Sequence, residues 1–295
     1  MGVFSRSWEI TKVTFSVMRK EKELFVFPII SIIFSFLFLL VMLFPTILIS
    51  FFKGTRPEFT YIVYGILFIT YLGLAFIATF FNVCVVYTAA LAFDRKPAKF
   101  WKTIKFSLSR IHLILMWSLV AATVGLILRI IEGAARKIKG IGGILLLITN
   151  SLVGLAWAIA TIFVIPGLVY HGLGPFAALK RSIITLKKTW GESLVRYLGM
   201  GAVAFLFIML GLVIGVPLMY ISLSLTGSIG LIIIALITVA YLISIFVLFG
   251  VAGQIFNTAL YVYAETGAIP LGYNREIMKN AFRNKKTSGM HNSLR

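Results

Sequence analysis

The sequence predicts an all-α fold, a polytopic membrane bundle of six transmembrane helices with interfacial amphipathic helices. Apolar residues make up 60% of the 295 residues and charged residues only 13%, which leaves too few polar side chains to cover a soluble core. The run 24–52 carries no charge over 29 residues, more than the about 20 that a helix needs to cross the hydrocarbon. Lys and Arg gather in alternate loops, as they do in multi-pass membrane proteins.

Long apolar stretches define the expected spans. Six of them are long enough to cross a bilayer, at 24–52, 61–93, 111–131, 141–170, 197–221 and 229–264. The first is expected to remain as an anchor, because it is longer than the apolar region of a signal peptide and no small-residue cleavage site follows it.

The distribution of Lys and Arg predicts the orientation. The N-terminal segment, 94–110, 175–196 and the tail hold five, six, five and six of them, 22 in all, whereas the loops between hold six. The positive-inside rule therefore places both termini in the cytoplasm, and it accounts for the net charge of +19 without a nucleic-acid partner. One cluster, Arg129 to Lys139, lies on the opposite side. A re-entrant hairpin of the third and fourth spans, which would not reach the far side, is the alternative that explains it.

Three basic segments are expected to form amphipathic helices in the headgroup plane. In 97–111 the apolar face holds Phe100, Trp101, Ile104, Leu108 and Ile111. In 176–190 it holds Phe176, Leu179, Ile183, Leu186 and Trp190, and near the N-terminus Phe4, Trp8, Phe15 and Met18. The cations expected to contact lipid headgroups or another anion are Arg129, Lys180, Arg181, Lys187 and Lys188. The expected partners are therefore anionic membrane lipids. The alternative is that these segments are soluble elbows packed on the bundle.

The order of these features predicts an internal repeat. Each basic helix precedes two spans, which gives three units at about 1–94, 95–174 and 175–264 within one transmembrane domain, 1–264. Pro97, Pro175 and Pro270 stand where the next basic segment begins, and proline favours the first turn of a helix. The tail 265–295 is then a cytoplasmic amphipathic segment that starts a fourth unit.

Polar side chains within the spans suggest two kinds of role. The candidates for the lining of a cavity between spans are Asn82, Gln254, Asn257, Tyr87 and Tyr170. Hydrogen bonding between helices is the alternative for the amides, because an amide in lipid must find a partner. Pro166 is expected to kink the fourth span, since it cannot donate to the carbonyl four residues before it. Gly211 and Gly215 are spaced for close approach of another helix.

Residues for catalysis are missing from the sequence. It contains no zinc-protease, phosphate-loop or serine-hydrolase motif, and the three histidines are scattered. The single cysteine, Cys84, lies in an apolar run and is expected to pack. We therefore expect no catalytic residue, no cofactor and no metal, and no enzyme.

Four stretches resemble a known family. They are FSRSWEITK near the start, LILRIIE at 126–132, GPFAALKRSIITLKKTWGE at 174–192 and YAETGAIPLGYNREIMKNAF at 263–282. Together they are similar to an uncharacterised family of prokaryotic six-helix membrane proteins, and more distantly to the membrane domain of glycerophosphodiester phosphodiesterases, whose catalytic barrel is absent from this chain. The resemblance implies an all-helical fold in a prokaryotic plasma membrane and transfers no active-site residue.

Two functions agree with these patterns. The first is a non-enzymatic, lipid-associating scaffold or accessory subunit, which the basic amphipathic segments favour. The alternative is a transporter or channel with a cavity between repeats, which Pro166, Asn82 and Asn257 favour. Either would leave room for a protein partner or for a second copy of the chain.

Overall fold

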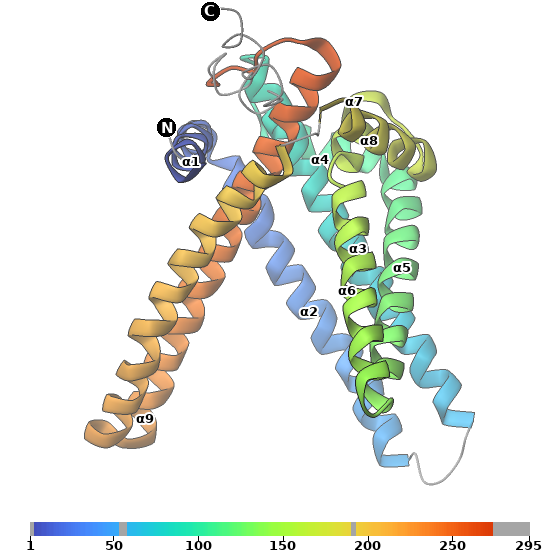
Figure 1. The fold of residues 1–295 in the computed structure, drawn as a ribbon, viewed down its shortest axis with the longest axis vertical. Coiled ribbons are helices and arrows are strands. Elements are labelled where there is room, and N and C mark those ends of the chain that lie inside the picture. Colours follow the sequence, from blue (N-terminus) through green and yellow to red (C-terminus); the bar gives the residue numbers. More distant parts are fainter. Residues whose placement is uncertain (1–2, 53–57, 190–192, 274–295) are drawn as a thin grey trace, which may run out of the picture. The chain divides into compact units, whose positions relative to one another are not determined.

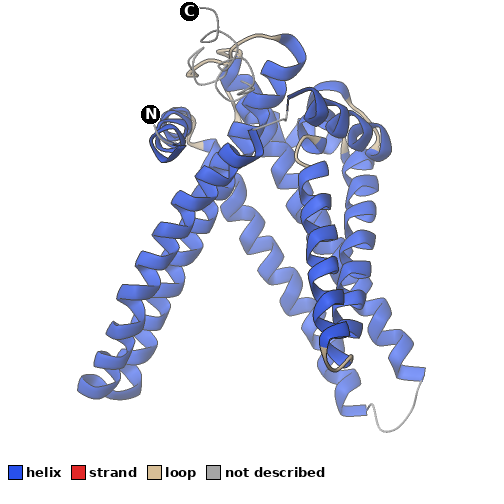
Figure 2. Ribbon diagram, in the orientation of Figure 1, coloured by secondary structure: helices blue, strands red, loops and turns tan. Residues whose placement is uncertain are grey.

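The structure, a computed structural model, describes residues 3–52, 58–189 and 193–273. Within these ranges all regular secondary structure is α-helical, so the all-α prediction is confirmed (Figures 1 and 2). The helices are α1 Val3–Lys20, α2 Glu23–Phe52, α3 Glu58–Phe93, α4 Phe100–Ser109, α5 Ile111–Lys137, α6 Ile141–Ala160, α7 Val164–His171, α8 Pro175–Thr189 and α9 Ser193–Thr266.

The described residues contain five helical stretches that are long and apolar enough to cross a membrane. They are Glu23–Pro45, Ile62–Phe93, Ile111–Lys137, Ile141–His171 and Gly201–Thr266. The last is 66 residues long and covers both the fifth and the sixth expected span. Its helical conformation is interrupted at Gly227, where φ is 66° and ψ is −153°, a backbone conformation that favours glycine. The described residues therefore hold five such stretches where six separate helices were expected.

The two arms of α9 on either side of Gly227 pack against each other (Figure 1). The Tyr241 hydroxyl donates to the carbonyl of Phe207 at 3.0 Å. A Cβ built on Gly211 would overlap the Tyr241 ring, and one on Gly215 would overlap Thr238. From Gly211 to Gly215 the first arm runs forward, whereas the residue it contacts in the second arm moves back from Tyr241 to Thr238. The two arms are therefore antiparallel. Gly211 and Gly215 thus provide the close approach for which they are spaced.

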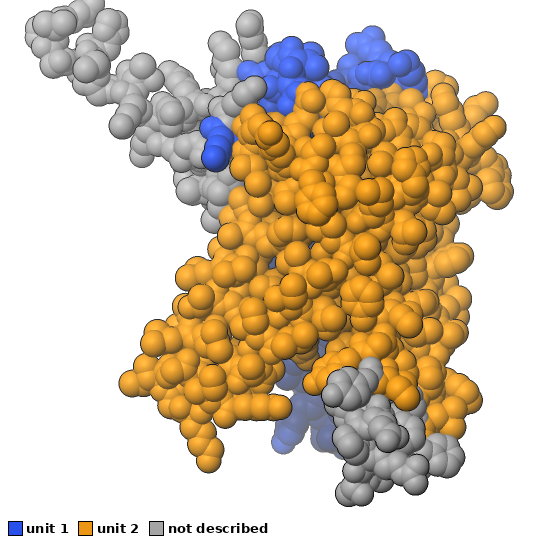
Figure 3. Space-filling view, turned by 90° about the vertical axis from the view of Figure 1, so that its right-hand side faces the viewer, with its two compact units in different colours: residues 1–25, 92–96, 187–295 blue, residues 26–91, 97–186 orange. Residues whose placement is uncertain are grey.

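The chain divides into two compact units, which Figure 3 colours separately. Unit 1 comprises 1–25, 92–96 and 187–295, and unit 2 comprises 26–91 and 97–186. These boundaries differ from those of the three expected repeats, so the repeats stay a prediction.

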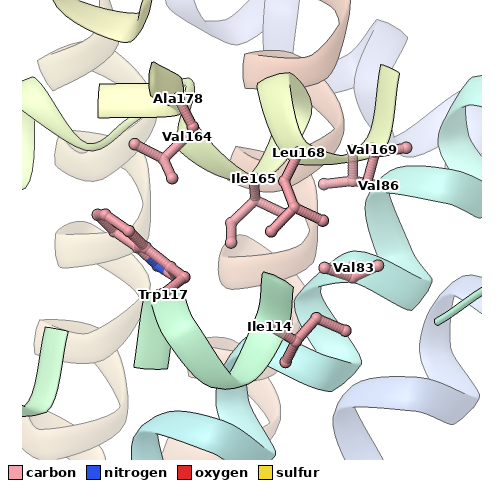
Figure 4. Packing of buried hydrophobic residues seen from close by; sticks show 9 residues of the cluster. All are labelled: Val83, Val86, Ile114, Trp117, Val164, Ile165, Leu168, Val169 and Ala178. Carbon is pink, nitrogen blue, oxygen red and sulfur yellow. The ribbon is translucent and has the colours of Figure 1, made fainter. Parts of the chain in front are cut away.

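The core of unit 2 lies around the C-terminal third of α3. Its buried residues come from α3, α5, α7 and α8, as Figure 4 shows: Val83, Val86, Ile114, Trp117, Val164, Ile165, Leu168, Val169 and Ala178. Earlier in α3, most side chains between 62 and 78 are exposed or half-buried. We call the packed region, 81–91 with α4, the start of α5, α7 and α8, the head of unit 2. Most of the apolar surface outside the head faces the surroundings, as expected for helices in lipid.

The fourth expected span is broken within the head. Helix α6 ends at Ala160, a turn covers 161–163, and α7 begins at Val164. Pro166 is the third residue of α7, and it has no N–H to donate to the carbonyl of Ile162. The interruption lies where Pro166 was expected to produce a kink. With 20 residues, α6 alone is about 30 Å long, enough to cross the hydrocarbon before the break.

Helices α5 and α6 form an antiparallel pair. The Asn150 amide donates to the carbonyl of Leu128 at 3.1 Å, which is the hydrogen bond between helices expected of an amide in a span. Further along, the rings of Trp117 and Trp157 stack with centroids 5.9 Å apart.

Candidate functional site

Helix α4 is held against α3 by small polar side chains. Cys84 and Ser107 are joined by a hydrogen bond of 3.1 Å, and one turn further along Thr88 and Thr103 are joined at 3.4 Å. All four side chains are buried. Small side chains let two helices approach closely, and their hydroxyls satisfy one another in the interface.

Helix α8 is held against the break between α6 and α7 by Ser182. Its hydroxyl donates to the carbonyl of Ala160 at 2.6 Å and accepts from the N–H of Phe163 at 3.2 Å. Both backbone groups belong to the region where the regular helical pattern is interrupted. Because Ser182 is fully buried, no water competes for these groups, and the hydroxyl closes the break.

Arg110 caps the other end of α7. Its guanidinium donates to the carbonyl of Leu168 at 3.0 Å and lies 5.2 Å from the centre of the Phe106 ring. Gly172 ends α7 in the left-handed conformation, and a Cβ there would overlap the guanidinium. A cation at a helix C-terminus is favourable, so Arg110 is explained as a structural cap.

In unit 1 the corresponding contact joins α1 to Tyr273, in the segment that follows α9. The hydroxyls of Thr14 and Tyr273 are 2.9 Å apart and buried. The rings of Phe93 and Phe256 lie 6.2 and 6.4 Å from the ring of Tyr273. Burial raises the pKa of the Tyr273 phenol, so this group stays protonated and available for the hydrogen bond.

The outward faces of α4 and α8 carry aromatic and basic side chains. Trp101 is 77% exposed and Phe176 is 74% exposed. Lys105 and Lys180 are also exposed. Neither lysine forms an ion pair within the part of the chain that the structure describes.

The faces by which α4 and α8 pack differ in part from the expected apolar faces. Of the nine expected residues that are described, four are exposed, four are half-buried and Leu186 is buried; the exposed four are Trp101, Leu108, Ile111 and Phe176. Thr103, Ser107 and Ser182 pack instead. The physical reason is that the apolar periodicity marks the side that prefers lipid, and lipid is as apolar as another helix. Trp190 and the side chains of Phe4 and Trp8 lie outside the described residues.

The five residues expected to line a cavity fall into the two units. Asn82 is half-buried in unit 2, Tyr87 stacks on Phe106 with ring centroids 3.8 Å apart, and Tyr170 is exposed. Gln254 and Asn257 belong to unit 1. Asn257 is 6% exposed, and its amide oxygen has no hydrogen-bond partner among the described residues. A cavity shared by all five stays a prediction.

The five expected anion contacts differ in their surroundings. Arg129 pairs with Glu132 at 2.9 Å, and Arg136 pairs with the same carboxylate at 2.6 Å, which is the clasp that the three-residue spacing allows. Lys180 and Lys187 are exposed on α8, and Arg181 is half-buried and engaged in other contacts. The side chain of Lys188 lies outside the described residues. Lys180 and Lys187 are thus the two of this set that the structure leaves open to a ligand.

The buried hydroxyls are the residues that the sequence interpretation missed. Ser107, Ser182 and Thr14 were assigned no role, although each stands two residues after a lysine and six after an aromatic residue. That common spacing was the available signal. In the described ranges no group of three His, Cys, Asp or Glu could hold a metal ion.

A comparison with protein-family models gives one match. A family described as a family of unknown function, DUF6159, matches residues 61–270. No curated protein matches the chain. The expectation of an uncharacterised family is confirmed, and the expected distant likeness to glycerophosphodiester phosphodiesterases is not supported by either comparison.

Proposed function

The chain belongs to this family of unknown function, DUF6159, and on that premise we propose that it is a non-enzymatic membrane protein that associates with lipids as a scaffold or accessory subunit. One observation carries the proposal: α4 and α8 are fixed to the ends of apolar helices by buried hydroxyls and turn exposed aromatic and lysine side chains outward. Aromatic rings and lysines on one face suit the boundary between acyl chains and headgroups.

The proposal includes six crossings, with the basic helices and both termini on the cytoplasmic side. The two arms of α9 supply the fifth and sixth crossings, and Gly227 lies in the turn between them. Helix α5 has 27 residues and is therefore about 40 Å long, which supports a full crossing of the third span. The charge distribution supports the orientation in a prokaryotic plasma membrane.

The alternative function, a transporter or channel, draws on the break in the fourth span and on the amide oxygen of Asn257. Interrupted helices bind substrates in many transporters. Here, however, Ser182 closes the break, and α6 is long enough to cross the hydrocarbon before the break is reached. Both facts favour a packing role for the interruption.

Thiol labelling and solute flux separate the two functions. In a Cys84→Ala background, Asn82→Cys and Asn257→Cys would be exposed to a water-soluble maleimide in proteoliposomes. We expect neither to react, because a packed scaffold excludes water from both positions, and we expect no flux of small ions. Lipids that remain with the purified chain would be identified by mass spectrometry, with enrichment of anionic over zwitterionic species as the expected result. Rapid labelling at both positions, together with ion flux, would replace the scaffold with the transporter.

A further inference from the structure

Helices α4 and α8 carry the same pattern in the same register. In α4 it is Trp101, Lys105 and Ser107, and in α8 it is Phe176, Lys180 and Ser182. An aliphatic residue follows each serine, Leu108 in one and Ile183 in the other. Each residue of the pattern in α8 lies the same number of residues after its counterpart in α4. The two helices therefore match in spacing as well as in residue type.

The structure gives the two ends of this pattern opposite surroundings. Ser107 and Ser182 are both 0% exposed and hydrogen-bonded to a neighbouring span or to the break in one. The lysine two residues earlier lies about 160° around the helix from the serine, since each residue turns by about 100°. The serine therefore fixes the rotation of the helix, and that rotation directs the aromatic ring and the lysine outward.

Helix α1 carries the pattern a third time in sequence, with Trp8, Lys12 and Thr14. Thr14 is 0% exposed, as Ser107 and Ser182 are, and is hydrogen-bonded to Tyr273 in the segment that follows α9. The side chain of Trp8 lies outside the described residues, so the inference below concerns α4 and α8.

The charge around these helices favours an anionic ligand. Between Asp94 and Glu192 the sequence has a single acidic residue, Glu132, which pairs with two arginines near the far end of α5. No carboxylate in that stretch is left to neutralise Lys105 or Lys180. A lysine beside an exposed aromatic ring offers a cation for a phosphate and an apolar surface for the chain attached to it.

We propose that Trp101 with Lys105 and Phe176 with Lys180 form two equivalent sites, each of which binds the phosphate of an anionic phospholipid. The ring lies among the acyl chains and the ammonium group contacts the headgroup. The proposal rests on the proposed lipid association and adds the lipid class and the residues that select it.

The test compares two double variants of the full chain with equal changes in charge. Lys105→Gln/Lys180→Gln removes both ammonium groups of the sites. Lys99→Gln/Lys102→Gln removes two exposed lysines at the start of α4, outside the pattern. Each protein, in a neutral detergent, is titrated with a pyrene-labelled phosphatidylglycerol, a matching phosphatidylcholine or inorganic phosphate. Binding of the lipids is followed by energy transfer from tryptophan, and the melting temperature is measured in all three titrations.

We expect the wild-type chain to bind phosphatidylglycerol more tightly than phosphatidylcholine and to show no melting-temperature shift with inorganic phosphate. The Lys105/Lys180 variant should bind phosphatidylglycerol about fivefold more weakly at each site, because each site loses one surface lysine that contributes about 1 kcal/mol. The Lys99/Lys102 variant should bind as the wild type does. Unchanged melting temperatures without lipid would show that both variants are folded, as expected for exposed side chains.

Each other outcome has a definite meaning. Equal losses of affinity for phosphatidylglycerol in the two double variants would overturn the two sites, because they would indicate nonspecific electrostatic attraction of the lipid to the basic surface. A stabilisation by inorganic phosphate equal to that by phosphatidylglycerol would show a site for soluble anions and would also overturn them. Wild-type protein that does not distinguish the two lipids would refute the sites, and if it also carries no enriched anionic lipid after purification, the proposed function fails with them.

Discussion

At the scale of single residues, the head of unit 2 depends on hydroxyl groups that satisfy buried backbone. Ser182 is the clearest case, because one side chain serves both a carbonyl and an N–H at the break between α6 and α7. When a buried backbone group loses its hydrogen-bond partner, the loss of folding stability is larger than the average net contribution of a hydrogen bond. The chain is therefore more sensitive to the loss of a single oxygen here than to most changes on its lipid-facing surface.

Replacement of Ser182 by alanine tests this sensitivity. Ser182→Ala removes the hydroxyl that bonds to the carbonyl of Ala160 and the N–H of Phe163, and we expect it to reduce the free energy of unfolding by about 1–3 kcal/mol. The measurement is thermal unfolding in detergent. The matched control is Ser151→Ala on α6, whose exposed hydroxyl bonds to the carbonyl of Leu147 in its own helix. Equal melting temperatures for the two variants would contradict the role given to Ser182.

The Tyr273 phenol predicts a dependence of stability on alkaline pH. Burial raises its pKa in the folded chain, so the folded state keeps a proton that the unfolded state releases above about pH 10. The contribution of this group is complete below that pH and falls as the pH rises toward the folded-state pKa. The fall in stability of wild type between pH 9.5 and 11 should therefore be steeper than that of Tyr273→Phe, by chemical denaturation in detergent. Parallel pH profiles would contradict a buried, protonated Tyr273.

At the scale of elements, pairs of antiparallel helices are held by close approach at a few positions. In α9 the approach depends on Gly211 and Gly215, whose missing side chains leave room for Tyr241 and Thr238. Large residues at such positions force the helices apart, and in a membrane no hydrophobic effect between helices compensates for the lost packing.

Substitution of Gly215 measures the strength of that contact. Gly215→Leu would overlap Thr238 and should reduce stability by about 1–3 kcal/mol, the usual cost of overpacking. Gly250→Leu in the opposite arm is the control, because nothing lies within 4 Å of the position of its Cβ. Resistance to proteolysis and the melting temperature are the measurements. A larger effect at 250 than at 215 would exclude this packing of the arms.

The sequence predicts some elements better than others, for physical reasons. Runs without charge locate the spans because a charge in hydrocarbon is costly, and the missing N–H of Pro166 locates the break. The orientation of α4 and α8 could not be predicted from hydrophobicity, because an apolar face is about equally stable against lipid and against another helix. The signal lay in Ser107 and Ser182, whose buried hydroxyls need partners, and it is visible only when the two helices are aligned with each other.

At the scale of the whole molecule, sidedness is the property that the function requires. On the proposed function, the basic helices lie on the side where anionic lipid is bound, and the turn between α5 and α6 lies on the other. The candidate site is therefore only partly predictable from the sequence. The charge of Lys180 identifies it as a candidate contact for an anion, whereas the roles of Trp101 and Phe176 depend on the rotation of their helices, which only the structure shows.

Labelling from outside intact cells tests this sidedness. In a Cys84→Ala background, Lys139→Cys at the turn between α5 and α6 should react with a membrane-impermeant maleimide added to cells. Lys105→Cys on α4 should react only after the membrane is opened. Both positions are exposed, so a lack of reaction reports the side of the membrane rather than burial. Reaction of both only in opened cells would instead support a re-entrant hairpin of the third and fourth spans.

The hydrogen bond between Thr14 and Tyr273 joins residues separated by 259 positions. A ribosome therefore synthesises α1 before every other described helix, and the partner of Thr14 after all of them. An incomplete chain that stops before residue 273 therefore lacks this hydrogen bond, and contacts such as that between the rings of Phe15 and Phe249 are then all that attach α1 to α9.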